Sequence, residues 1–256
     1  MTELHRAVAE GFTAGAAAYA SGRPDYPAEL DVWLREALGL AAGKTALDLG
    51  AGTGKFTPRL LATGAAVTGV EPVAAMRAQF VRALPDVPVL EGSAEAIPCP
   101  DGSVDAVVCA QSFHWFATPA ALAELRRVLK VGGALGLVWN LRDLRVGWVR
   151  ALAAIIEAHR GDAPGHESGA WRRLFPAPGF SPLAERRFAY AHEGPIERVI
   201  VERSLSTSFI AAMPEAERAG IAAAIRELIA ETPEFAGRER ATYPYETIAV
   251  STRRTD

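Results

Sequence analysis

The stretch that decides the fold reads Ala46-Leu47-Asp48-Leu49-Gly50-Ala51-Gly52-Thr53-Gly54-Lys55-Phe56. An apolar run ends at three alternating glycines, and a segment with helical spacing of its apolar residues follows over 56–62. Because glycine has no Cβ, a ligand can approach the backbone of such a turn closely. The N–H groups that begin a helix favour an anionic group. The stretch therefore predicts a strand, a ligand-binding turn and a helix in succession.

Outward from this stretch, apolar runs alternate with helix-like segments. The predicted strands are 45–49, 66–70, 87–90, 104–110 and 134–139, and the predicted helices are 56–62, 73–84 and 119–129, the last ended by Gly132-Gly133. This alternation implies a parallel sheet with right-handed crossovers. Two later runs with alternating polarity, 183–190 and 246–252, predict an antiparallel pair at the sheet edge.

Composition and charge exclude several classes of protein. The chain has 256 residues, half of them hydrophobic, with 27 basic and 30 acidic side chains, which is typical of a globular protein without affinity for nucleic acid. Two cysteines are too few for a disulfide framework. The N-terminus lacks a signal-peptide pattern, and polar residues interrupt the uncharged segment 106–123, so no membrane association is predicted. We expect a soluble cytoplasmic protein.

The glycine pattern distinguishes between two nucleotide-binding families. The dinucleotide fingerprint G-x-G-x-x-G would require glycine where Lys55 stands, which disfavours a nicotinamide-dependent oxidoreductase. The pattern G-x-G-x-G with Asp48 two residues before Gly50 resembles motif I of the class I S-adenosylmethionine-dependent methyltransferases. The resemblance implies that the backbone of the turn holds S-adenosylmethionine, and that Asp48 orders the turn. The residues of the turn assigned to the cofactor are Gly50, Ala51, Gly52 and Gly54.

Two further segments resemble the same family. Glu71 ends the second predicted strand, and a carboxylate there can accept both ribose hydroxyls. Pro72 favours extended backbone at Glu71, and the resemblance implies that Met76 packs near the adenine. The run from Glu91 to Asp105 resembles the family's G-D-A-E-x-L-P-F-x-D-x-S-F-D, with serine at the first Asp position. The residues of these segments and the next strand end that are assigned to the cofactor are Glu71, Pro72, Met76, Ser93, Ala94, Glu95 and Gln111.

The family resemblance implies an α/β fold: a Rossmann-like, doubly wound, mostly parallel seven-stranded sheet with a late antiparallel strand and an inserted helical cap. We expect a single domain over 1–256. Its parts are N-terminal lid helices (1–43), a cofactor-binding core (44–140), a helical cap on the acceptor side (145–232) and the edge strands 183–190 and 246–252.

The acceptor site is predicted from two segments and one strand end. Gln111-Ser112-Phe113-His114-Trp115-Phe116 lacks the (N/D)-P-P-(Y/F) loop of the amino-methylating enzymes. Within it His114 is either a general base or a histidine that shapes the pocket. The run Tyr19-Ala20-Ser21-Gly22-Arg23-Pro24-Asp25-Tyr26-Pro27 resembles a subgroup that includes trans-aconitate-type methyltransferases. The predicted acceptor residues are Tyr19, Arg23, His114, Trp115, Asn140 and Arg142.

The function indicated is methyl transfer from S-adenosylmethionine to an O, N or C atom of a small molecule, by a monomer or homodimer without a metal. Two alternatives stay open. One is an RNA or protein methyltransferase, which an arginine-rich face would favour. The other is a non-catalytic protein that binds S-adenosylmethionine, which would bind the cofactor without transferring its methyl group.

Overall fold

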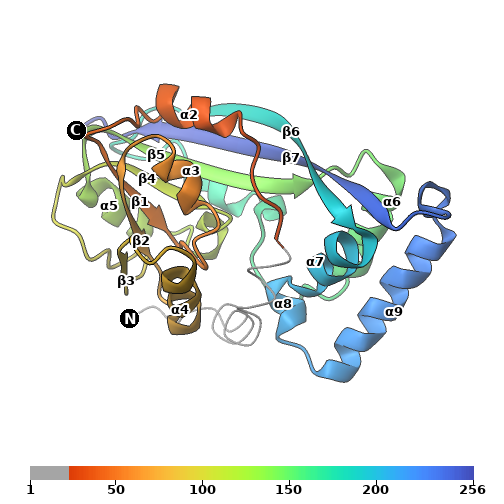
Figure 1. The fold of residues 1–256 in the computed structure, drawn as a ribbon. Helices are drawn as coiled ribbons and strands as arrows, with labels where there is room; N and C mark the ends of the chain where they lie inside the picture. Colours follow the sequence, from red (N-terminus) through yellow and green to blue (C-terminus); the bar gives the residue numbers. More distant parts are fainter. Residues whose placement is uncertain (1–22) are drawn as a thin grey trace.

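A twisted sheet of seven strands, in the order β3-β2-β1-β4-β5-β7-β6, organises the part of the chain that the computed structural model describes, residues 23–256 (Figure 1). The strands are β1 (Thr45–Leu49), β2 (Ala66–Val70), β3 (Val89–Leu90), β4 (Val104–Ala110), β5 (Leu129–Arg142), β6 (Ala184–Pro195) and β7 (Arg240–Arg253). The first five are parallel, and β7 pairs antiparallel with both β5 and β6. The predicted doubly wound sheet with a late antiparallel strand is confirmed.

Helices cover both faces of the sheet, which explains why its central strands are almost continuously apolar. On one face α2 (Leu30–Glu36) and α3 (Thr57–Leu61) bury Trp33, Leu34 and Leu60 against alternate residues of the sheet. On the other face α5 (Pro119–Val128) buries Leu122 and Leu125. Phe80 of α4 (Ala74–Ala83) is fully buried and approaches Gly54 and Gly69. Successive side chains of the central strands point to opposite faces of the sheet, and both faces are buried. The molecule therefore has three layers, with the sheet between two layers of helices.

The strand order reverses between β1 and β4. From β1 the chain moves outward through β2 to β3, whereas β4 leads to β5 on the other side. The crossover helices therefore diverge and leave a crevice at the carboxyl ends of β1 and β4, where α/β sheets bind ligands. The glycine turn after Leu49 and the loop after Ala110 both lie at this point.

The helical segment predicted as a cap is divided into two parts by β6. One part is α6 (Gly147–Glu157), which precedes β6, and the other lies between β6 and β7. The second part contains the π-helical segment Glu197–Glu202, α7 (Arg203–Leu205), α8 (Ser208–Ala211) and α9 (Glu215–Glu231). These helices gather at the far end of the long strands β6 and β7 (Figure 1) and share a second hydrophobic cluster with Tyr243 and Tyr245 of β7.

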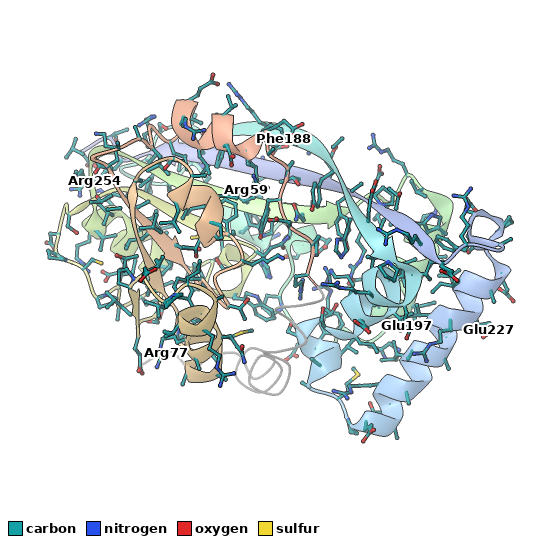
Figure 2. All side chains as sticks on the ribbon, viewed as in Figure 1. Arg59, Arg77, Phe188, Glu197, Glu227 and Arg254 are labelled. Atoms are coloured by element: carbon teal, nitrogen blue, oxygen red, sulfur yellow. The ribbon has the colours of Figure 1, made fainter. Side chains whose placement is uncertain are left out.

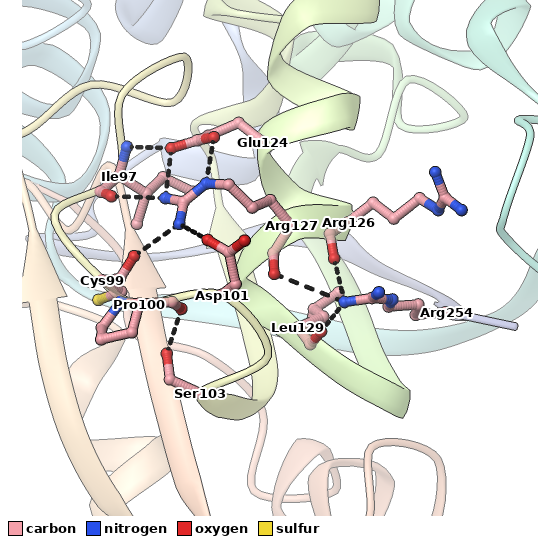
Figure 3. Close-up of polar contacts among 10 residues, drawn as sticks. All are labelled: Ile97, Cys99, Pro100, Asp101, Ser103, Glu124, Arg126, Arg127, Leu129 and Arg254. Carbon is pink, nitrogen blue, oxygen red and sulfur yellow. Dashed lines mark hydrogen bonds and ion pairs between the residues drawn. The ribbon is translucent and has the colours of Figure 1, made fainter. Parts of the chain in front are cut away.

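Helix α5 does not end at the predicted glycine pair. It ends at Val128, and Leu129 is already extended, so Gly132-Gly133 lies within β5. The last carbonyls of the helix are satisfied by other segments instead. Arg254 donates to the carbonyl oxygen of Arg126 at 2.7 Å and to that of Leu129, the first residue of β5 (Figure 3), and the N–H groups of Gly102 and Ser103 donate to the carbonyl oxygens of Arg127 and Val128 at 2.8 and 2.9 Å. Since Arg254 follows β7, sequence near α5 could not reveal this cap.

Other element boundaries differ by a few residues from the prediction. The strand expected from 87 covers only Val89–Leu90. Both edge strands are longer than predicted, because their far ends pack on the cap helices. Within residues 23–256, no helix is long and apolar enough to cross a membrane.

Candidate functional site

The glycine turn is held against the end of β2 by two backbone hydrogen bonds. The N–H groups of Gly50 and Ala51 donate to the carbonyl oxygen of Val70 at 2.8 and 3.2 Å. Gly50 has φ +69°, and a Cβ there would lie 2.7 Å from the Cβ of Ser112. Gly52 has φ +58° with open space where its Cβ would stand. Glycine is therefore needed at 50 for both space and conformation, and at 52 for conformation.

A buried carboxylate faces this turn from the end of β2. Glu71 is 5% exposed, and its two oxygens accept hydrogen bonds of 2.9 Å from the N–H groups of Gly52 and Val73. Burial raises the pKa of Glu71, and these backbone hydrogen bonds oppose the rise. Arg77 of α4, labelled in Figure 2, donates to the carbonyl oxygens of Glu71 and Pro72 at 2.8 Å. The turn after β2 is thereby fixed with its carboxylate beside the glycines.

A second carboxylate, Asp48, lies beneath the turn. It is 1% exposed and accepts a hydrogen bond of 2.7 Å from the hydroxyl of Thr57, the first residue of α3. Burial raises the pKa of Asp48 to about 7, the Thr57 hydrogen bond lowers it, and the charge of Glu71 adds to the rise. Asp48 therefore connects the end of β1 to the helix that follows the turn.

Beside the turn lies a cavity of about 180 Å³. We call it the larger cavity, because an adjoining second cavity, described below, measures about 100 Å³. The predicted site residues that line it are Arg23, Asp48, Gly50, Ala51, Gly52, Glu71, Pro72, Met76, Ser93, Ala94, Glu95, Gln111, Trp115 and Asn140. At one end Met76 is fully buried, and the Glu95 carboxylate accepts a hydrogen bond of 2.9 Å from the Thr118 hydroxyl. The loop that carries Ser93 to Glu95 continues to Ile97 and Cys99, whose carbonyl oxygens Arg127 binds (Figure 3).

The loop after β4 forms the side of the larger cavity nearest the cap. Gln111 adopts φ +60°, an uncommon value for a residue with a side chain. Its side-chain amide donates to the carbonyl oxygen of Asn140 at 3.2 Å, and the hydroxyl of Ser112 donates to that of Leu49 at 2.7 Å. These contacts join the ends of β1, β4 and β5. The unusual backbone conformation of Gln111 is therefore stabilised by its neighbours at the crevice.

A second cavity, of about 100 Å³, adjoins the first and extends beneath the cap. Both cavities are lined by Arg23, Gln111, Trp115, Asn140 and Arg203. Arg23 donates to the carbonyl oxygen of Ser206 at 3.3 Å, so the segment before α2 contacts the cap where the cavities meet. Because the two cavities share these five residues, ligands bound in them would be neighbours.

His114 lines the second cavity and is not among the residues of the larger one. Its Nδ1 accepts a hydrogen bond of 3.1 Å from the indole N–H of Trp139. Burial, with smaller effects from His166 and Arg160, lowers the pKa of His114 to about 3. The ring is therefore neutral at pH 7, and one of its nitrogens is occupied.

Asn140 and Arg142 have protein partners. The Asn140 amide donates to the carbonyl oxygen of Asp25 at 2.9 Å, and its oxygen accepts from the Thr247 hydroxyl at 2.6 Å. Arg142 donates to the Tyr243 hydroxyl at 3.1 Å and lines the second cavity but not the larger one. Asn140 thus holds the segment before α2 at the sheet, in addition to lining both cavities.

One predicted site residue among those that the structure describes lines neither cavity. Gly54 is absent from both linings, and a Cβ there would meet Leu84 and Phe80 at 2.8 and 2.9 Å, so its small size serves the packing of α4. Tyr19 lies outside the described residues. Sequence reasoning missed Arg203, although it stands four residues after the buried Val199, at a spacing that places both on one helix face.

The comparisons with known proteins agree with this geometry. A family model described as a methyltransferase domain matches residues 47–137. A methyltransferase-like protein of Schizosaccharomyces pombe is 37% identical over 244 residues, which cover 95% of each chain. An uncharacterized methyltransferase of Mycobacterium tuberculosis is 38% identical over 250 residues, which cover 98% of each chain. A solved structure named as a type II methyltransferase, from Anaeromyxobacter dehalogenans, has a TM-score of 0.67 at 27% identity and covers 91% of this chain and 98% of its own.

Proposed function

Because this chain belongs to the S-adenosylmethionine-dependent methyltransferases, we propose that the larger cavity binds S-adenosylmethionine and that the acceptor is a small molecule in the second cavity. The observation that carries the proposal is the Glu71 carboxylate, which lies in the larger cavity 2.9 Å from the N–H of Gly52. A carboxylate and a glycine turn at this strand end are the combination that suits a nucleoside with an attached amino acid.

The residues of the larger cavity fit the parts of this cofactor. Each Glu71 oxygen accepts one backbone hydrogen bond, and a carboxylate oxygen can accept two, so acceptor capacity is left for ribose hydroxyls. Gly50, Ala51 and Gly52 provide backbone without bulky side chains for the methionine end. Met76 and Ala94 are buried apolar groups suited to the adenine, with Ser93 and Glu95 beside them.

S-adenosylmethionine, when bound, supplies an electrophilic methyl group on a sulfonium with a thioether leaving group. The contribution of this chain is to bind the acceptor in the second cavity and orient its lone pair toward that methyl group. Gln111, Trp115 and Asn140 line both cavities and are placed for this task. We assign His114 to positioning, since an imidazole with a pKa of about 3 is a weak proton acceptor at pH 7.

Enclosure supports a small acceptor. Arg23 from the segment before α2 and Arg203 from the cap contribute to both cavities, so the site lies beneath these segments. The run at 19–27 resembles the trans-aconitate-type subgroup, and membership of that subgroup is part of this proposal. A carboxylate-bearing acceptor would agree with it.

The test has a binding arm and a turnover arm. Thermal shifts with S-adenosylhomocysteine and with NAD are measured on the wild-type protein and on Glu71→Ala. A ligand at a hundred times its dissociation constant adds about 2.7 kcal/mol to the free energy of unfolding. We expect stabilisation by S-adenosylhomocysteine, none by NAD, and a weaker effect in Glu71→Ala.

For turnover, transfer of a labelled methyl group is screened over small acceptors, with bulk RNA and a protein extract as parallel substrates. Labelling of a small molecule supports the proposal. Labelling of RNA or protein alone would contradict the acceptor class, and cofactor binding without any labelling would favour the non-catalytic alternative.

A further inference from the structure

Arg203 is a buried arginine without a partner in the part of the chain that the structure describes. The residue is 6% exposed, and its Nε and Nη1 are buried without a hydrogen-bond partner. No carboxylate among residues 23–256 pairs with it. A guanidinium has five N–H donors, and burying a charge without an acceptor costs free energy. Such a group is expected only where a bound anion offsets this cost.

The other cations under the cap are paired, unlike Arg203. Both carboxylate oxygens of Glu157 accept hydrogen bonds from Arg160, and Oε1 of Glu157 lies 3.7 Å from Nη1 of Arg142. Oε2 of Glu167 lies 3.3 Å from Nη2 of Arg160. These two glutamates are the carboxylates that line the second cavity, and neither pairs with Arg203. Apart from Arg23, the charged residues that line the cavity are these two glutamates and three arginines, Arg142, Arg160 and Arg203. Positive charge therefore exceeds negative charge around the cavity.

Two other buried polar atoms of the same cavity lack partners in the described structure. They are the hydroxyl oxygen of Thr207 and Nε2 of His166. A threonine hydroxyl is a hydrogen-bond donor, and a neutral imidazole donates from whichever nitrogen carries its proton. Nδ1 of His114 is engaged by Trp139, but no such contact satisfies Thr207 or His166. Unsatisfied buried polar groups require an explanation, and a polar ligand provides one for all three residues.

We propose that the second cavity binds an anionic oxygen group of the acceptor, a carboxylate or a phosphate, and that Arg203 is the residue that selects for it. This inference rests on the proposed function, because it names the acceptor class of the same site. Arg203 lines both cavities, so an anion bound there holds the rest of the acceptor beside the larger cavity. A guanidinium fork binds planar anionic oxygens bidentately, which fixes orientation as well as position.

The position of Arg203 supports this role. It follows directly on the π-helical segment Glu197–Glu202, and π-helical turns are rare and are frequently found at functional sites. The preceding Val199, Ile200 and Val201 are buried in the second hydrophobic cluster. Arg203 is therefore carried by a packed element, which fixes the backbone from which its side chain reaches both cavities.

The experiment compares a planar anion and a tetrahedral anion with a neutral probe of nearly the same shape as the planar one. Benzoate, benzamide and phenyl phosphate are titrated calorimetrically into the wild-type protein saturated with S-adenosylhomocysteine. Arg203→Met, which keeps the length of the side chain and removes its charge, is titrated in the same way. Arg226→Met is the matched control, because Arg226 is an exposed arginine of the cap that pairs with Glu197. Arg203→Lys keeps the charge without the fork and serves if the methionine variant does not fold.

We expect benzoate or phenyl phosphate to bind the wild-type complex at least tenfold more tightly than benzamide, and which of the two binds better identifies the anion. In Arg203→Met the preference for the anion over benzamide should disappear, and in Arg203→Lys it should be smaller than in the wild-type protein. In Arg226→Met this preference should be unchanged. Affinity for S-adenosylhomocysteine should stay within about twofold in Arg226→Met, which in terms of free energy is about 0.4 kcal/mol. Because Arg203 also lines the larger cavity, a loss of this affinity in Arg203→Met that exceeds its loss of affinity for the anionic probe would assign the guanidinium to the carboxylate of the cofactor and overturn the inference.

A preference that survives in Arg203→Met would overturn the inference, and so would the absence of binding by either anion at millimolar concentration. The proposed function fails separately, since it fails if S-adenosylhomocysteine does not bind the wild-type protein. A melting temperature of ligand-free Arg203→Met that does not fall below the wild-type value would further support the inference. Removal of an unpaired buried charge relieves a cost, whereas loss of a structural contact would add one.

Discussion

The carboxylate of Glu71 and the backbone N–H of Gly52 are joined by a hydrogen bond of 2.9 Å, across the ends of β2 and β1. The two residues stand 19 positions apart in the chain and meet because β1 and β2 are adjacent parallel strands with Leu49 opposite Val70. This contact aligns the carboxylate with the glycine turn. The geometry for binding a nucleoside thus exists in the protein before the nucleoside binds.

Replacing Glu71 by alanine should weaken the binding of S-adenosylhomocysteine. A hydrogen bond to a charged group contributes about 2 kcal/mol, so the dissociation constant should rise about thirtyfold, as measured by calorimetry. Glu91→Ala is the control, because Glu91 is an exposed carboxylate on the next strand end, paired with Arg77 at 2.6 Å. An equal loss of affinity in both variants would contradict the role of Glu71.

Replacing Gly50 by alanine should destabilise the fold more than replacing Gly132 by alanine. Both residues have positive φ, +69° and +79°, so each substitution incurs a backbone cost of about 1–2 kcal/mol. Only at 50 would the new Cβ meet a neighbour, 2.7 Å from Ser112, whereas nothing lies within 4 Å at 132. Chemical denaturation should therefore show a further loss of about 1–3 kcal/mol in Gly50→Ala. Equal losses would mean that Ser112 moves away without cost.

Asp48 should make the free energy of unfolding depend on pH. Its pKa of about 7 in the folded protein exceeds the unfolded value near 4, so the folded state binds the proton more tightly between these pH values. Stability therefore falls as pH rises through this window and levels off above about 7. Asp48→Asn keeps a side-chain oxygen that can accept the hydrogen bond of the Thr57 hydroxyl, but this side chain does not titrate.

The measurement is chemical denaturation of the wild-type protein and Asp48→Asn at several pH values. Relative to the variant, the wild-type protein should lose roughly 3 kcal/mol between pH 5 and pH 8. Parallel curves for the two proteins would show that Asp48 titrates normally.

Asp105 should stabilise the fold without affecting the site. It lies at the opposite end of the sheet, at the start of β4, and accepts hydrogen bonds from Lys130 at 2.8 Å and from the N–H and hydroxyl of Thr45 at 3.0 and 2.9 Å. Burial opposes its ionisation, but hydrogen bonds from Lys130, Thr45 and Lys44 outweigh burial and hold the pKa well below its usual range. The stability that Asp105 contributes is therefore present above pH 4 and lost as pH falls below it.

Asp105→Asn should lower the free energy of unfolding at pH 7 by about 1–3 kcal/mol, and the difference from wild type should shrink toward pH 3. Affinity for S-adenosylhomocysteine should be unchanged in calorimetry at pH 7. A large loss of affinity in a folded variant would show that the two ends of β4 are coupled.

Local sequence was sufficient for the strands that carry the glycine turn. The bounds predicted for β1, β2 and β4 are those of the structure, because a buried strand bounded by polar or glycine residues reveals its own ends. The residues of the larger cavity were predictable for a related reason. Apart from Arg23, Met76 and Arg203, the residues discussed lie at or shortly after a strand end, and parallel strands bring these ends to one edge of the sheet.

Other features depended on contacts between distant segments. The carbonyl groups at the end of α5 are satisfied by Arg254 and by the N–H groups of Gly102 and Ser103, and the far ends of β6 and β7 pack on the cap helices. It could not be predicted either that Trp115 lines both cavities whereas His114 lines only the second. Both lie in one short helical turn, Phe113–Trp115, where adjacent side chains point in different directions.

By itself, the sequence determined the parallel sheet and the carboxylate that follows the second strand, because strand periodicity and glycine conformation are local properties. Only the tertiary structure decided which residues meet beneath the cap. Arg203 is separated from Glu71 by more than half of the chain, and no local pattern records that its guanidinium is buried without a counter-charge. Burial and pairing of a charge are properties of the packed molecule, because the desolvation cost arises only when distant segments exclude water around the group.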